Sequence, residues 1–60
     1  MHYIEKGKLI GKVMALITQT EHDIELARKR NVLPHVISYY KENNQYAKDI
    51  LVIIRALPEN

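Results

Sequence analysis

The chain has 60 residues, of which 47% are hydrophobic and 27% are charged, and its formal net charge is +2. This composition is typical of a folded domain and excludes an intrinsically disordered tail. Cysteine is absent, which excludes disulfides and thiolate metal sites and favours the reducing cytoplasm. Because so short a chain buries only about 60% of its unfolded surface, we expect one small domain that gains stability by forming a homodimer.

Residues 3–30 have the apolar period of an amphipathic helix. Their apolar stripe recurs at alternating spacings of three and four, in the series Ile10, Val13, Ile17, Thr20, Ile24 and Ala27. We predict one helix over about residues 4–30. Thr20 followed by Asp23 resembles a helix-capping pair, which leaves open a kink or a break in this helix.

A short turn at residues 31–33 is predicted to separate this helix from a second one. Asn31 suits a helix end, and Pro34 suits a first helical turn, where its missing N–H costs nothing. Short connections join antiparallel neighbours. The prediction is therefore an all-α antiparallel helical hairpin, with the second helix over about residues 34–57. A buried strand over 49–57 is the less favoured alternative, since short β-branched runs fit both structures.

The two helices are expected to face each other along matched stripes. The stripe of the second helix contains Val36, Tyr40, Asn43, Ala47, Ile50, Ile54 and Leu57. A hairpin that pivots near Val32 places residues whose numbers sum to roughly 64 opposite each other, so Thr20 meets Asn43 or Asn44. Such a polar layer fixes the register of a helical seam when its hydrogen bonds are satisfied. The other interpretation of the two asparagines is a bend or a solvated spot.

The second helix carries more apolar surface than one neighbouring helix covers. Tyr39, Tyr46 and Ile53 are spaced by sevens, and Leu57 extends the row. An exposed apolar row marks a protein interface, where tyrosine is favoured. We expect these four residues, with Leu26 of the first helix as a second candidate, to form either the seam of a homodimeric four-helix bundle or a docking surface for a larger protein.

Residue types that carry enzymatic chemistry lack their usual sequence partners. Ser38 is the single serine and lies outside a Gly-x-Ser-x-Gly turn. Neither His22 nor His35 has a second ligand at the spacing of a zinc site. The sequence therefore predicts no enzyme, no cofactor and no metal site. Its apolar runs are shorter than the roughly 20 residues that cross a bilayer, so we also expect no membrane span.

Two functional hypotheses follow from these patterns. The first is a small regulatory protein that docks on a larger protein, such as a transcription or replication factor, and modulates it. The second is a dimeric regulator that binds the phosphate backbone of RNA or DNA through basic clusters at the ends of the first helix. These clusters contain Lys8, Lys12, Arg28, Lys29 and Arg30. A helix-turn-helix over residues 20–44 is less favoured, because Val36–Tyr40 offers few polar side chains that could read bases.

Overall fold

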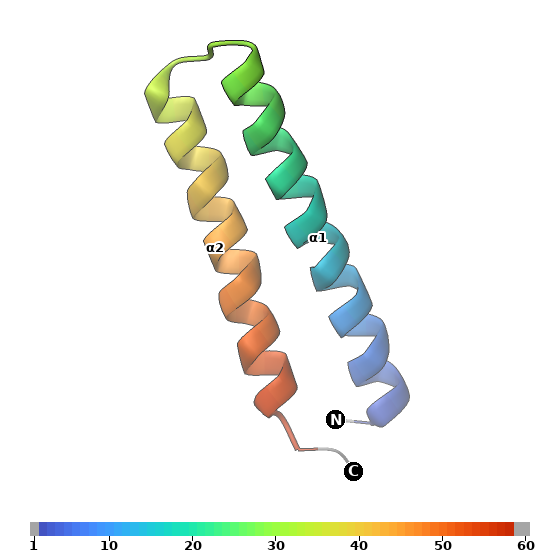
Figure 1. Cartoon of the computed structure of the whole chain (residues 1–60). Helices are drawn as coiled ribbons and strands as arrows, with labels where there is room; N and C mark the ends of the chain where they lie inside the picture. Colours follow the sequence, from blue (N-terminus) through green and yellow to red (C-terminus); the bar gives the residue numbers. More distant parts are fainter. Residues whose placement is uncertain (1, 59–60) are drawn as a thin grey trace.

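The computed structural model describes residues 2–58, and these residues form a hairpin of two α-helices (Figure 1). Helix α1 spans Tyr3–Lys29 and helix α2 spans Pro34–Ala56. The two helices run antiparallel, and the start of α1 lies at the same end of the hairpin as the end of α2 (Figure 1). The all-α helical hairpin predicted from the sequence is confirmed, and the described part of the chain contains no strand.

Local interactions explain where α1 ends and the turn begins. Asn31 has a φ of 52°, in the left-handed region that asparagine tolerates better than most residues. The N–H of Asn31 donates to the carbonyl of Arg28 at 3.3 Å, and the N–H of Val32 donates to the carbonyl of Ala27 at 3.2 Å. These two hydrogen bonds form a Schellman motif, which satisfies the last carbonyls of the helix. Pro34 then occupies the first turn of α2, as predicted.

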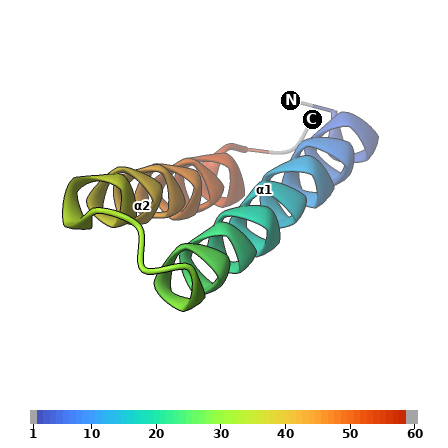
Figure 2. The ribbon, with the colours of Figure 1, turned by 90° about the horizontal axis from the view of Figure 1, so that it is seen from above.

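The hairpin is a single layer of two helices, so its core is thin (Figure 2). Its Cα atoms extend over 47 × 14 × 8 Å. The main hydrophobic cluster consists of Val13, Ala47 and Ile54, and the half-buried side chains packed against it are Leu9, Ile10, Ile17 and Leu51. No side chain in the described range is completely shielded from solvent. Two helices therefore cover each other along one seam and leave their other faces open.

At two positions, the part of α2 that faces α1 is shifted by one residue from the predicted stripe. Asn43 was placed in the stripe, with Asn43 or Asn44 opposite Thr20, and the structure buries Asn44. Leu51 packs into the core in place of Ile50, which is exposed. We call the observed row the inner seam, and it contains Tyr40, Asn44, Ala47, Leu51 and Ile54. The prediction was wrong here because residues 50–54 are all apolar, so hydrophobic pattern alone did not define the rotation of the helix.

A polar layer at Thr20 and Asn44 sets this rotation. Asn44 is only 7% exposed, and its Nδ2 donates to Thr20 Oγ1 at 2.8 Å and to the Ile17 carbonyl at 3.3 Å. The Thr20 hydroxyl in turn lies 2.9 Å from the Leu16 carbonyl, to which it donates. The predicted polar layer is thus confirmed with Asn44 as the partner. Helix α1 continues through Thr20 without a break, which also removes the helix-turn-helix interpretation.

We predict that Thr20→Val lowers the free energy of unfolding by about 1–3 kcal/mol, because it removes the nearer acceptor of a buried amide. The double variant Thr20→Val/Asn44→Leu should regain most of this loss, since replacing both polar partners by apolar groups is often close to neutral. Urea denaturation followed by circular dichroism, at one chain concentration, measures the effect. Thr18→Val is the matched control, because Thr18 is exposed and its hydroxyl also donates to a helical carbonyl. Equal losses for Thr18→Val and Thr20→Val would contradict the prediction.

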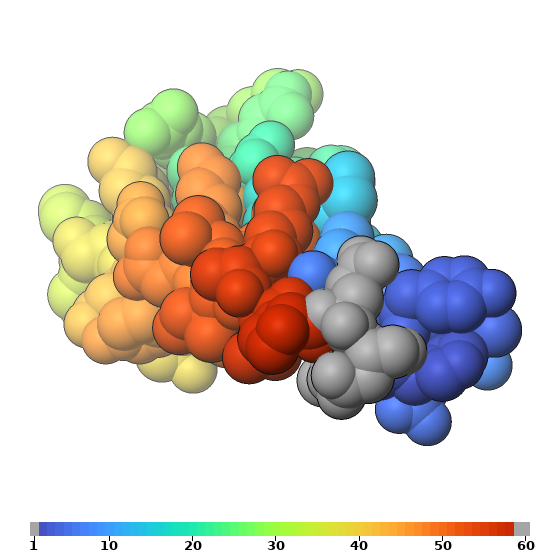
Figure 3. All heavy atoms as spheres, turned by 90° about the horizontal axis from the view of Figure 1, so that it is seen from below, coloured from blue at the N-terminus to red at the C-terminus, as the bar shows by residue number. Residues whose placement is uncertain are grey.

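At the open end of the hairpin, the end of α2 lies beside the first turns of α1 (Figure 3). Lys6 joins the two helices there. Lys6 is buried, and its Nζ donates to the carbonyls of Leu57 at 2.7 Å and Arg55 at 3.2 Å. A cation at this position satisfies carbonyls that have no partner within the helix and interacts favourably with the helix dipole. Lys6 therefore stabilises the last turn of α2.

Lys6→Met keeps most of the side-chain length but removes these hydrogen bonds. We expect it to lower the free energy of unfolding by about 1 kcal/mol and to speed amide hydrogen exchange in the last turn of α2. Hydrogen exchange monitored by NMR checks the local effect, and Lys8→Met, at an exposed position two residues away, is the control. Similar exchange rates in the two variants would show that Lys6 does not cap α2.

Neither α1 nor α2 combines the length and the apolar content that a bilayer-spanning helix needs.

Candidate protein-interaction surface

A second row of side chains runs along α2 beside the inner seam. We call it the outer stripe, and it contains Tyr39, Asn43, Tyr46, Ile50, Ile53 and Leu57. Most of its members precede a residue of the inner seam by one position. Because an α-helix turns by about 100° per residue, the outer stripe lies roughly 100° around α2 from the inner seam. It therefore lies to one side of the contact with α1.

The outer stripe is mostly apolar and open to solvent. Tyr46 is 55% exposed, Ile50 is 47% exposed and Ile53 is 62% exposed, and Tyr39 and Leu57 are exposed as well. The structure brings four of the five interface candidates from the sequence into this one row. Ile50 and Asn43 also belong to it, although the sequence analysis assigned them to the contact with α1. The spacing by alternating threes and fours was visible in the sequence, but it did not distinguish the two rows.

Between the outer stripe and α1 lies a groove of about 300 Å³. Its lining residues are Val13, Leu16, Thr20, Asn43, Tyr46, Ala47 and Ile50. Val13 and Ala47 are buried, whereas Leu16, Tyr46 and Ile50 are exposed. The exposed side chains thus surround the groove, and its buried lining residues, Val13 and Ala47, belong to the hydrophobic core. Such a groove accepts the side chains of a neighbouring helix in the way that helical seams interlock.

Tyr46 has its polar end anchored on its own helix. Its hydroxyl donates to Glu42 Oε1 at 2.9 Å. This hydrogen bond and the negative charge of Glu42 raise the pKa of Tyr46 above its ordinary value of 10.0, because both disfavour the phenolate. The bond satisfies the hydroxyl, while more than half of the side chain stays exposed. The arrangement resembles the use of tyrosine at interfaces, where the ring is buried and the polar end keeps a partner.

We predict that Glu42→Gln lowers the pKa of Tyr46 toward 10.0, because the carboxylate charge is lost. Since the folded-state pKa is raised, the stabilisation from this pair is present below pH 10.0 and is lost as the pH rises through the folded-state pKa. An NMR titration of the Tyr46 ring signals measures the shift. Glu21→Gln on α1 is the control, and an unchanged Tyr46 titration in Glu42→Gln would contradict the assignment.

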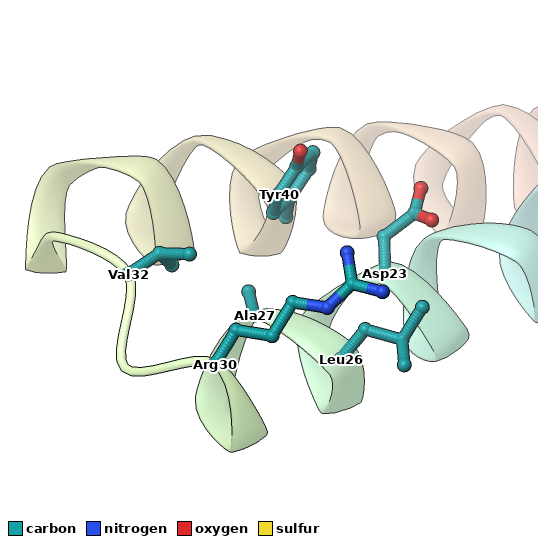
Figure 4. Close-up of a pocket in the computed structure, with 6 residues that line it drawn as sticks. All are labelled: Asp23, Leu26, Ala27, Arg30, Val32 and Tyr40. Atoms are coloured by element: carbon teal, nitrogen blue, oxygen red, sulfur yellow. The ribbon is translucent and has the colours of Figure 1, made fainter.

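Leu26 lies apart from the outer stripe, at the turn end of the hairpin (Figure 4). It lines a small pocket of about 140 Å³ together with Asp23, Ala27, Arg30, Val32 and Tyr40. In this view the Arg30 side chain extends back across the pocket beside Ala27 (Figure 4). Asp23 accepts a hydrogen bond at Oδ1 from Gln19 Nε2 at 3.0 Å. The structure therefore does not bring Leu26 together with the four other interface candidates.

The candidate basic residues lie in two separate groups. Lys8 and Lys12 lie near the start of α1, whereas Arg28, Lys29 and Arg30 lie at its end near the turn, and all five are exposed. Lys29 Nζ pairs with Glu25 Oε1 at 3.2 Å on the surface of α1. A third group, which the sequence analysis missed, is the row Lys41, Lys48 and Arg55 on α2. The sequence feature that could have revealed this row is the spacing of its members by seven residues. The cations are thus divided between the two ends of α1 and a row along α2.

Residue types that bind metals or act in catalysis remain dispersed. Across residues 2–58, no three His, Asp or Glu side chains group closely enough to hold a metal ion. His35 and Ser38 line one side of a shallow, open depression on α2 with Val36, Tyr39 and Glu42.

Comparison with known proteins identifies no relative for this chain. No family model, no curated protein and no solved structure matches it.

Proposed function

We propose that the chain is a small, non-enzymatic regulatory protein that acts by protein–protein interaction, and that the outer stripe is its binding surface. One observation carries this proposal: a row of large apolar side chains, interrupted at Asn43, is exposed along α2. Soluble monomers seldom expose a contiguous apolar patch larger than a few hundred Å². An exposed patch of this kind is stabilised when another polypeptide covers it.

The composition of the stripe supports a protein partner more than other ligands. It contains no charged residue, two of its six members are tyrosines, and the acidic side chains of Glu42 and Asp49 lie beside it. Protein interfaces share this arrangement, in which an apolar and aromatic centre lies within a polar rim. The adjoining groove, with Leu16 on its far side, extends the apolar surface onto α1.

The interaction takes one of two forms in this proposal. Two copies of the chain associate as a homodimer, or the chain docks on a larger protein, such as a transcription or replication factor, and modulates it. The cytoplasm is the proposed setting, because a chain without cysteine needs no oxidising compartment. Both forms use the outer stripe, so its accessibility is the property to be tested first.

The nucleic-acid alternative has less support from the surface. A phosphate-binding site gains affinity from several cations that contact the backbone together. Here Lys12 and Arg28 belong to groups at different ends of α1, and Lys29 already pairs with Glu25. A dimer would carry two copies of each basic group, and the nucleic-acid alternative depends on this duplication. It stays a prediction from the sequence.

We predict that a photo-crosslinking amino acid in place of Tyr46 forms a defined adduct with another polypeptide in cells that express the chain. The same group in place of Lys48 should give little adduct, because two residues along α2 correspond to a turn of about 200°. Denaturing electrophoresis and mass spectrometry identify the adduct, whether it is a second copy or another protein. Absence of an adduct at position 46, or equal yields at both positions, would contradict the proposed function.

A further inference from the structure

We infer that the outer stripe is covered by helix α2 of a second copy of this chain, so that two hairpins form a four-helix bundle. This inference rests on the proposed function, because it names the partner of the same surface. It follows from the geometry of α2, from the surface that the hairpin leaves open, and from the chemistry of the stripe itself.

The angular relation of the two rows places α2 at the corner of a larger bundle. The inner seam faces α1, and the outer stripe lies roughly 100° away around the helix axis. A helix at the corner of a four-helix bundle has two neighbours in about this relation. Helix α1 is one of these neighbours, and the outer stripe marks the direction of the other.

The spacing of the outer stripe indicates that this second neighbour is a helix. From Tyr39 to Leu57 its members alternate steps of four and three, which is the pattern of helices packed at a shallow angle. At a rise of about 1.5 Å per residue the row is roughly 27 Å long. Helix α2 itself, with 23 residues, is long enough to cover such a row.

The surplus surface of one hairpin is comparable to, though smaller than, the area that a typical dimer interface buries on each partner. The chain exposes 4659 Å², whereas a compact protein of 7.0 kDa exposes about 4,000 Å². Its radius of gyration is 14.1 Å, compared with roughly 10 Å for a compact domain of this length. The excess of roughly 600 Å² per chain approaches the approximately 800 Å² per partner of a typical stable interface. A second copy therefore supplies about as much cover as the hairpin lacks.

The stripe is also complementary to itself. Its occupant must be an apolar helix, and the outer stripe of α2 satisfies this requirement. The side of α1 that borders the groove carries Lys12, Gln19 and Asp23 near Leu16, so it is less suited to cover an apolar row. Pairing of α2 with α2 makes an isologous contact, which closes as a dimer and exposes no further copy of the same surface.

Asn43 is the one polar member of the stripe. Its neighbour Asn44 is satisfied by Thr20, but the structure shows no hydrogen bond for the side chain of Asn43. An asparagine at a seam position restricts the register and the number of helices at a cost in affinity. Asn43 thus limits how two α2 helices associate, and its replacement by leucine should tighten the dimer.

Sedimentation equilibrium of the purified full chain, over a range of concentrations, tests this inference. The wild-type protein should approach twice the chain mass of 7.0 kDa. Ile53→Ser should weaken the dimer by about tenfold or more, because each chain loses an apolar side chain from the seam. Val52→Ser is the matched control. Val52 is 67% exposed and adjacent to Ile53, but lies off the stripe, so this variant should keep the wild-type mass.

A second variant, Asn43→Leu, tests the same interface if Ile53→Ser fails to fold. Asn43→Leu should increase the association constant by about tenfold and leave the helix content unchanged. A wild-type protein that stays at 7.0 kDa at all concentrations would overturn the second copy as the partner. Equal losses of mass in Ile53→Ser and Val52→Ser would overturn it as well. In either case, an adduct between position 46 and a different protein would leave the proposed function standing. The absence of any adduct at position 46, or equal yields at positions 46 and 48, would contradict the proposed function itself.

Discussion

The hydrogen bond between Asn44 and Thr20 determines which side of α2 faces α1. Five successive apolar residues, from 50 to 54, give this helix no unique buried face, so several rotations bury similar apolar area. The amide of Asn44 distinguishes among them. If it were buried without an acceptor it would cost about 1–3 kcal/mol, and Thr20 Oγ1 lies within 2.8 Å in the observed rotation. A rotation by one residue would remove this contact and bury Asn43 in its place.

The remaining features of the surface follow from this rotation. With Asn44 inside, Leu51 and Ile54 pack on α1, while Ile50 and Ile53 point outward. The outer stripe therefore results from the same constraint that forms the core. Its apolar residues contribute less than the core to the stability of one hairpin, because the chain leaves much of their surface exposed. An interface at this position would be coupled to folding, since both depend on the rotation of α2.

Specific hydrogen bonds stabilise this two-helix layer at both of its ends. At the turn, the left-handed conformation of Asn31 and two backbone hydrogen bonds close α1, and at the other end Lys6 caps α2. Between these ends only a narrow seam is buried. A second copy on the outer stripe would add apolar burial where the single hairpin has least, and the apparent stability would then rise with protein concentration. The fraction of folded chains would then increase with the total concentration of the protein.

The sequence by itself determined the two helices, the turn between them and the surplus of apolar residues on α2. These features depend on local signals: the apolar period of three and four, Asn31 and Pro34 at the break, and the row of residues spaced by sevens. Only the tertiary structure decided that Asn44 is inside and Asn43 outside, that Lys6 caps a helix, and that Leu26 lies apart from the outer stripe. Each of these depends on the distance between residues far apart in the chain. A one-residue change in rotation alters such a distance but leaves the hydrophobic pattern almost unchanged.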